Sequence, residues 1–410
     1  LGLYVYFFVR GEVRHRRHLF RASKERIVRI RLALQRGEKI DLQKSEGQWR
    51  LTSPVKARAD QMQVDSLLTS LSNLEEQSRV EAKALDPAKI GLKNPPFTIS
   101  VWTREGGKPA AAGKPEVLYL GDDTPDGNAL YARLQGRRDI LVLSSYVRSQ
   151  FNKTADDLRD KKPFHFTTPE EVIALGLRRG TEIIALRRGK AKGQAAGTWT
   201  ISAPIKTEAD SPSVDELVRA LQGLNLAKFV EEKPKDFGVF GLTSPRLVVS
   251  AKWRKKGERR AHTDILLIGG PYESDQCYVR VQGQQAIAAL KNEDLSKFDK
   301  SLFDLRDKKV VRFDRASLDR VVVRKGDKST TLAKKGKDWL LQPGDKPTQA
   351  GKAEDLLWDL EDLRAQQFVE EQVKDLAKYG LDKPALEVTL AAGGEEKGLL
   401  AAPVPSAAQY

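Results

Sequence analysis

Hydrophobic and polar residues follow the same order three times along this chain of 410 residues. Each time, a short stretch of alternating apolar residues leads to a strand-like stretch with a tryptophan. A ladder of apolar residues at i, i+1, i+4 and i+7 follows, and further short apolar stretches come after it. Alternation with period two predicts β-strands, and the ladder predicts one face of an α-helix. The pattern therefore predicts α+β units in tandem.

The strands of each unit are expected on both sides of the helix. Opening strands are predicted at 27–32, 182–186 and 320–324, and tryptophan strands around Trp49, Trp199 and Trp339. Pro54 and Pro204 should end two of the tryptophan strands, because proline cannot continue a ladder of hydrogen bonds. Strands expected after the helix lie at 97–102, 116–121 and 129–135 in the first unit, and at 246–253, 264–269 and 277–282 in the second.

The helices are predicted at the leucine-rich ladders 67–74, 217–224 and 356–363. Asp60 and Asp210 stand at N-cap distance before the first two, where a carboxylate can accept hydrogen bonds from free amides of the first turn. Gly351 takes this place in the third unit and is a weaker cap. The stretches 140–151 and 286–298 are interpreted as a strand or turn leading into a closing helix.

Other motifs recur in register with the strands and the helix. Phe20, Phe166 and Phe313 open units about 147 residues apart, and Gly-Leu-x-x-Pro recurs at Gly91, Gly241 and Gly380. The motif DLRDKK recurs near the end of the first unit, at 157–162, and near the end of the second, at 304–309. Each unit is expected to be a mainly antiparallel sheet packed by one or two helices. The predicted boundaries are 1–19 for an N-terminal tract, 20–165 for unit 1, 166–312 for unit 2, and 313–410 for a truncated unit 3.

Composition narrows the possible chemistry. The chain is 40% hydrophobic and 31% charged, which suits globular domains. A single cysteine, Cys277, excludes an intramolecular disulfide framework and a cysteine-based zinc site. No nucleotide-binding motif occurs. The sequence thus indicates no catalytic residue, no cofactor site and no metal site.

Isolated reactive residues receive structural interpretations. The loop with Asp122, Asp123 and Asp126 resembles part of a calcium loop but lacks EF-hand spacing, so a polar hairpin turn is favoured. His165 and His262 lack a nucleophile at a known motif spacing and are interpreted as solvated or core-edge histidines.

Two of the recurring side chains allow a functional alternative. The tryptophans are interpreted as core residues rather than ligand platforms. Arg159 and Arg306, each between aspartates of DLRDKK, could form ion pairs that fix one unit against the next. A functional anion site is the alternative for these arginines.

The net charge of +15 raises the possibility of a polyanionic partner. The stretch 252–260 carries six cations and one acid, and the stretch 187–193 is also basic. Because the two stretches occupy different places in the repeat, no shared nucleic-acid groove is implied, and scattered solvated hairpin tips are the alternative. The candidate polyanion contacts are Lys252, Arg254, Lys255, Lys256, Arg259 and Arg260.

The N-terminal nine residues, LGLYVYFFV, are too few to span a bilayer, which needs about 20 residues. They are interpreted as the end of a membrane helix, with a short buried strand as the alternative. The arginine-rich tract at 10–17 would keep the body of the protein cytoplasmic by the positive-inside tendency.

The ordered set of W-x-[LI]-x-x-P, Ala-Asp, leucine ladder, [FS]-x-V-E and G-L-x-x-P resembles the bacterial domain of unknown function 4340 family. The resemblance implies a membrane-anchored protein, often encoded beside ABC-type permease components of gliding-motility export systems, with its body outside the cytoplasm. The arginine-rich tract points to the opposite orientation.

Two functions follow as hypotheses. The first is a non-enzymatic scaffold or accessory protein of an ABC-type transporter or cell-envelope complex at the bacterial inner membrane, with permease components as partners. The second is a polyanion-binding module for envelope glycopolymer, anionic lipid or nucleic acid, of which nucleic acid is the least favoured. A hydrolase is a third and remote hypothesis.

Overall fold

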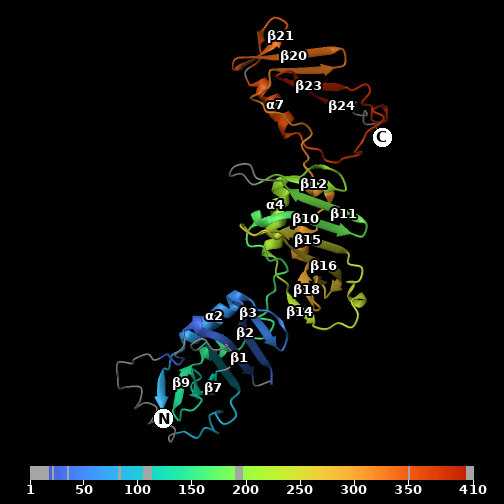
Figure 1. The fold of residues 1–410 in the computed structure, drawn as a ribbon. Coiled ribbons are helices and arrows are strands. Elements are labelled where there is room, and N and C mark those ends of the chain that lie inside the picture. The colour runs from blue at the N-terminus through green and yellow to red at the C-terminus, as the bar shows by residue number, and fades with distance from the viewer. Residues whose placement is uncertain are drawn as a thin grey trace. The chain divides into compact units, whose positions relative to one another are not determined.

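A computed structural model describes residues 18–20, 23–34, 37–81, 85–104, 113–189, 197–349 and 351–402. Its strands form three antiparallel sheets, two of nine strands and one of six, and a helix accompanies each sheet. This arrangement confirms the predicted repeat of a mainly antiparallel sheet with helices (Figure 1).

The internal contacts of the chain define two compact units, each described here by itself. The first comprises Leu1–His165, Gly223–Arg246 and Leu266–Asn292, and the second comprises Phe166–Gln222, Leu247–Ile265 and Glu293–Tyr410. The three sheets fall within residues 27–144, 172–291 and 320–401. That the three sequence units are independent domains remains a prediction.

The first sheet consists of two meanders joined through a helix. Strands β1 to β4 run outward in chain order, and the chain returns beside β1 at β6 and continues outward to β9, with β5 on the far edge. The order across the sheet is β4 (Ala57–Arg58), β3 (Gln48–Ser53), β2 (Lys39–Ser45), β1 (Ile27–Leu34), β6 (Phe97–Thr103), β7 (Glu116–Asp123), β8 (Ala129–Leu134), β9 (Ile140–Ser144) and β5 (Ser78–Val80).

One face of this sheet packs against helix α2 (Gln61–Ser72), which Figure 1 shows along the sheet. Alternate strand residues such as Ile30 and Leu42 point into this core, where they meet Leu67 and Leu71 of the helix. Asp60 accepts hydrogen bonds from the amides of Met62 and Gln63, so its carboxylate satisfies the first turn of the helix.

The second sheet repeats the order of the first strand by strand. The order is β13 (Thr207–Glu208), β12 (Trp199–Ala203), β11 (Glu182–Arg188), β10 (Val172–Arg179), β15 (Leu247–Trp253), β16 (His262–Tyr272), β17 (Gln276–Val281), β18 (Ile287–Lys291) and β14 (Lys228–Glu231). Helix α4 (Ser211–Gly223) buries Val214, Leu217, Val218 and Leu221. The amide of Ser213 donates to Asp210, the counterpart of Asp60.

The prediction of the opening strand of the second repeat was wrong, because it named the second strand of the repeat instead of the first. The stretch 182–186 belongs to β11, and the opening strand is β10. The outward positions of β10 include Ala174 and Gly176, where small residues hide the alternation of polar and apolar side chains. A Cβ atom on Gly176 would lie 2.6 Å from the hydroxyl of Ser250, so the neighbouring strand favours glycine there.

The third sheet reproduces the first six positions of this order. It runs β22 (Lys346–Pro347), β21 (Asp338–Gln342), β20 (Lys328–Lys335), β19 (Arg320–Lys325), β23 (Leu386–Ala392) and β24 (Glu395–Ala401). Helix α7 (Lys352–Asp362) buries Ala353, Leu357 and Leu360, and begins at Gly351 without a side-chain cap.

Short helices complete the repeats. The predicted closing helices are α3 (Tyr146–Phe151) and α5 (Asn292–Phe298), followed by α6 (Leu302–Leu305). Single 3₁₀ turns are η1 (Lys24–Arg26), η2 (Pro169–Glu171), η3 (Gly238–Phe240) and η4 (Ala377–Tyr379).

The predicted membrane segment lies outside the described residues, which begin at His18. Within the described ranges, no helix combines the length and the apolar character that crossing a bilayer requires. The proposed anchor therefore rests on the sequence alone.

Candidate functional site

The motif DLRDKK lies beside the start of the helix in its own repeat. In the first repeat, Ala59 and Arg159 form an isolated antiparallel bridge, and the amide of Asp60 donates to the carbonyl of Leu158 at 2.9 Å. In the second repeat, Ala209 and Arg306 form the same bridge, and the amide of Asp210 donates to Leu305 at 2.9 Å. The recurring Ala-Asp pair therefore holds the backbone of DLRDKK as well as capping the helix.

The arginine side chain of the motif reaches the next repeat. The guanidinium of Arg159, only 7% exposed, lies 3.3 Å from the ring centroid of Phe229. Its Nη1 donates to Oε1 of Glu232 at 2.5 Å. Stacking on an aromatic face combined with a charged hydrogen bond suits the planar guanidinium of arginine and does not suit lysine.

The second copy of the motif makes the same contacts. The guanidinium of Arg306 lies 3.4 Å from the centroid of Phe368, and its Nη1 donates to Glu371 at 2.5 Å. Arg159, Phe229 and Glu232 are called the first repeat junction, and Arg306, Phe368 and Glu371 the second repeat junction. Each junction lies inside one of the two compact units.

The aspartates of DLRDKK form hydrogen bonds with groups other than these arginines. Asp157 accepts from the amide of Thr154, and Asp304 accepts from the amide of Ser301 in a capping box. Hydrogen bonds from the Ser301 amide and hydroxyl lower the pKa of Asp304. Burial raises the pKa of Asp160, but the neighbouring His165 and the Lys162 amide outweigh burial and lower it overall. The aspartates thus shape the turns that present the arginines.

Comparison with known proteins identifies the repeats. The sequence model described as Domain of unknown function (DUF4340) matches residues 49–196, 199–384 and 339–402. The chain belongs to the DUF4340 family. No significantly similar protein was found among curated proteins or solved structures. The family assignment agrees with the resemblance of the motifs and adds no activity.

The tryptophans shared by the DUF4340 repeats lie in the cores. Trp49, Trp199 and Trp339 are at most 5% exposed. The indole Nε1 of Trp199 donates to Asp215 at 2.9 Å, and Arg188 stacks 4.6 Å from the ring centroid. These contacts lie within one repeat, so the tryptophans support its packing.

The glycines of Gly-Leu-x-x-P each end a tight turn. Gly91, Gly241 and Gly380 have φ of 70°, 69° and 64°, a left-handed conformation that glycine adopts without steric cost. The turn also packs closely on the sheet. A Cβ atom on Gly121 of β7 would lie 2.2 Å from the carbonyl oxygen of Ile90, and one on Gly269 of β16 would lie 2.2 Å from that of Phe240.

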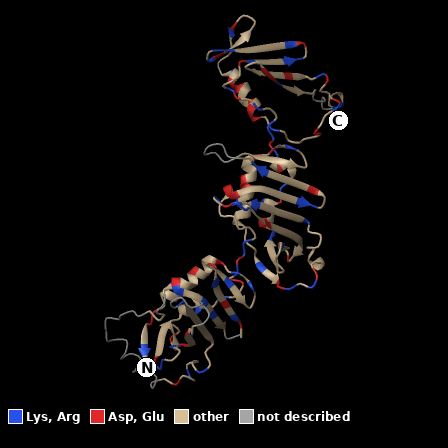
Figure 2. Cartoon of the chain, viewed as in Figure 1, with Lys and Arg blue, Asp and Glu red and all other residues tan. Residues whose placement is uncertain are grey.

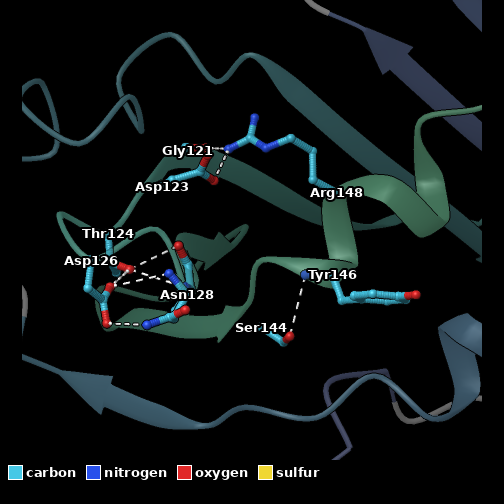
Figure 3. Close-up of polar contacts among 9 residues, drawn as sticks. Gly121, Asp123, Thr124, Asp126, Asn128, Ser144, Tyr146 and Arg148 are labelled. Carbon is cyan, nitrogen blue, oxygen red and sulfur yellow. Dashed lines mark hydrogen bonds and ion pairs between the residues drawn. The ribbon is translucent and has the colours of Figure 1, made fainter.

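The calcium-like loop uses its acids within the hairpin (Figure 3). Asp126 accepts hydrogen bonds from the Thr124 hydroxyl at 2.5 Å and the Asn128 side chain at 3.2 Å. Asp123 pairs with Arg148, which also donates to the carbonyl of Gly121 at 2.8 Å. Within the described ranges, no group of three or more histidine, cysteine or acidic residues could hold a metal ion.

The reactive residues noted in the sequence are engaged in packing or ion pairs. The Nε2 atom of His165 lies 3.4 Å from a carboxylate oxygen of Asp160. His262 stacks on Trp253 at 4.6 Å and pairs with Glu258. Cys277 is buried, and burial raises the pKa of its thiol.

The six basic candidates for polyanion contact are exposed. Lys252 lies on β15 and the other five lie on the hairpin between β15 and β16, while Trp253 beside them is buried. Among the described residues, none of the six forms an ion pair with an acid. The other basic stretch, 187–193, lies partly outside the described residues, which stop at Gly189 and resume at Gly197.

The sequence did not identify the partners of the junction arginines. Phe229, Phe368, Glu232 and Glu371 belong to the recurring F-V-E-E segments. A signal was present: DLRDKK lies near the end of repeats 1 and 2, and F-V-E-E occurs only in repeats 2 and 3. An element at the end of one repeat and another in the next repeat are expected to meet.

Proposed function

We propose that this DUF4340 protein is a non-enzymatic scaffold for an ABC-type transporter or another cell-envelope complex at the bacterial inner membrane, with its body outside the cytoplasm. The repeat junctions are the observation that carries this proposal. They couple consecutive repeats through the same three kinds of side chain, which suits a protein whose work is to hold several surfaces in sequence.

The kind of residue that recurs also supports a scaffold. A duplicated catalytic domain is expected to repeat its reactive side chains. Here the recurring positions fill the core, cap a helix, form a turn or join repeats, as Trp199, Asp210, Gly241 and Arg306 do. A hydrolytic or transfer activity that disappears on His165→Gln would contradict the non-enzymatic part of the proposal.

Support for the membrane and for ABC-type partners comes from the sequence. The apolar residues 1–9 precede the first repeat, and the family resemblance implies an anchor and neighbouring permease genes. The protein should therefore fractionate with membranes. Protease added to intact spheroplasts should digest the repeats, and their protection would contradict an extracytoplasmic body.

Purification from membranes in mild detergent tests the scaffold directly. Permease or other envelope proteins are expected to accompany the wild-type protein in fixed proportion, and less of them should accompany the double variant Arg159→Gln/Arg306→Gln. Arg320→Gln is the matched control, because the Arg320–Glu396 pair is about half exposed and lies outside both junctions. Recovery of the wild-type protein alone, or equal recovery of partners with all variants, would contradict the proposal.

A polyanion-binding module is the second candidate function. The observation that favours it is the exposed hairpin with Lys255, Lys256, Arg259 and Arg260, whose charges are not neutralised by ion pairs within the described chain. Binding to a soluble polyanion should weaken steeply as salt rises, since each neutralised phosphate releases counterions. A flat response to salt, or unchanged binding by Lys255→Gln/Lys256→Gln, would exclude this hairpin as the site.

A further inference from the structure

One face of the first sheet carries a row of basic side chains that lies opposite the helix. Arg58, Arg50, Gln43, Arg29 and Trp102 stand directly opposite one another on β4, β3, β2, β1 and β6. Directly opposed residues on neighbouring strands share a face of the sheet. The residues adjacent to them along the strands, such as Leu42 and Leu51, belong to the core under α2. The row therefore lies on the face turned away from α2.

Two arginines of this face are held in place by a buried carboxylate. Asp41, 4% exposed, pairs with Arg29 at 2.7 Å and with Arg31 at 2.6 Å. Both guanidiniums also lie over Trp102, at 4.7 and 5.4 Å from its centroid. The side chains of Arg29 and Arg31 remain 24% and 40% exposed. Their orientation is thus fixed while part of each side chain stays exposed.

Arg50 and Arg58 extend this pair across the sheet and are exposed. We call Arg29, Arg31, Arg50 and Arg58, with Asp41 and Trp102, the arginine face. It holds four permanent positive charges, with the Asp41 carboxylate between Arg29 and Arg31 and the Asp160 carboxylate near Arg58. The far half of the same sheet is covered, because Ile90 and Leu92 pack there against Tyr119 and Tyr131. Figure 2 draws lysine and arginine positions in blue on neighbouring strands of this sheet.

The other sheets show that the fold does not require these arginines. The equivalent row of the second sheet is Glu208, Thr200, Arg187, Ala174 and Lys252. That of the third sheet is Pro347, Leu340, Ala333, Arg320 and Ala391. Neither row repeats the buried aspartate or the stacked tryptophan. The arginine face is therefore an addition to the repeat and not part of its architecture.

We propose that the arginine face binds the anionic headgroups of a phospholipid surface. Guanidinium groups match phosphate oxygens with paired hydrogen bonds. Arg58, Arg50 and Arg29 span four neighbouring strands, about 14 Å at the usual strand spacing, so their guanidinium groups can meet several headgroups of one surface. A peptide ligand is usually held in a groove or along a sheet edge, and duplex nucleic acid is usually read by an element that enters a groove. The inference rests on the arginine face and does not depend on the proposed N-terminal anchor.

Vesicle binding by the whole chain tests this inference. Partitioning is compared between phosphatidylcholine vesicles and vesicles that also contain phosphatidylglycerol, because residues 1–9 could enter either kind. Each basic residue near an anionic surface is worth about fivefold in binding, or about 1 kcal/mol. Arg50→Gln/Arg58→Gln should therefore lose about 30-fold of the preference for anionic vesicles. Both side chains are exposed, so the variant is expected to fold.

A matched variant distinguishes binding through the arginine face from binding that depends only on net charge. Lys328→Gln/Lys346→Gln removes the same charge from exposed positions of the third repeat and should retain the preference for anionic vesicles within about twofold. An equal loss with both variants would overturn the inference in favour of net charge alone. It would also be overturned by absence of any preference for anionic vesicles, or by stronger arginine-dependent binding to polyglutamate or duplex DNA than to vesicles. None of these results bears on the repeat junctions, which purification with partners tests separately.

Discussion

The first and second repeats share a strand order but differ in the use of equivalent positions. In the second repeat, Phe229 stacks with an arginine of the preceding repeat. The first repeat has Arg79 at this position, which pairs instead with Glu76 and Asp139 of its own repeat. Conversely, the first repeat has Asp41 where the second has Ala185. The residues that the repeats share thus maintain the fold, and binding sites are expected at positions where the residues of the repeats differ.

The largest effect should come from a position that both repeats share. Trp49→Ala and Trp199→Ala should each destabilise the repeat concerned by about 3–5 kcal/mol, because each leaves a cavity in a packed core. Hydrogen exchange of strands β1 and β10 would measure the loss repeat by repeat. A large effect in one repeat and none in the other would break the structural equivalence of the two.

The next effect should distinguish two glycines that occupy the same turn. A Cβ atom on Gly241 would lie 2.7 Å from the backbone nitrogen of Gly270, whereas one on Gly91 would meet the side chain of Asp122 at 2.6 Å. Since a side chain can move and a sheet backbone cannot, Gly241→Ala should cost about 3 kcal/mol and Gly91→Ala about 1–2 kcal/mol.

Chemical denaturation measures these two costs. Gly257→Ala is the control, because its φ is also positive and its Cβ would meet nothing within 4 Å. Equal costs for Gly91→Ala and Gly241→Ala would show that backbone conformation alone requires glycine in this turn.

Acid should weaken the first repeat through Asp41, which the second repeat lacks. Burial raises the pKa of Asp41, but hydrogen bonds from Arg29 and Arg31 outweigh burial and lower it overall. The ion pairs therefore stabilise the fold above the unfolded pKa of about 3.9, and their contribution is lost as the pH falls through the folded pKa.

Asp41→Asn should cost about 1.5–3 kcal/mol at neutral pH, the range for hydrogen bonds to charged groups, and should remove this acid sensitivity. Amide protection of β1 and β2 between pH 7 and acid, compared with that of β10 and β11, measures the effect. Acid sensitivity that persists in Asp41→Asn would assign it to another group.

The smallest effect should come from the junctions, whose two arginines differ in burial. Arg159 is 7% exposed and Arg306 is 14% exposed. Arg159→Gln should weaken the coupling of its repeats by about 1.5 kcal/mol, and Arg306→Gln by somewhat less. The paired variants Glu232→Gln and Glu371→Gln complete double-mutant cycles, and additive effects would contradict a direct interaction.

Much of this fold follows from local patterns in the sequence. The leucine ladders, Asp60, Pro54 and the recurring tryptophans each act within a few residues, so their spacing predicts the helices and most strands. The opening strand of the second repeat was missed because Ala174 and Gly176 replace the polar residues that reveal alternation elsewhere.

The candidate sites depended on information that spacing alone does not contain. Arg159 meets Glu232 across 73 residues, and the arginine face combines Arg29, Arg50 and Arg58 through strand register. A shift of one residue in any pairing would move a side chain to the other face of the sheet. The sequence thus indicated which residues recur but not which residues lie opposite one another.

At each junction the arginine belongs to the earlier repeat and the phenylalanine to the later one. This order affects how the number of repeats can change in evolution. In the second repeat, Phe229 contacts the arginine of the preceding repeat, and Arg306 contacts the phenylalanine of the next repeat. The second repeat therefore contains both kinds of junction residue. A gene duplication of this repeat would create a new copy already able to join its neighbours on both sides. The first repeat has Arg79 in place of this phenylalanine and therefore has no aromatic ring at this position on which the arginine of a preceding repeat could stack. Growth and loss of copies in evolution are therefore expected to occur behind the first repeat.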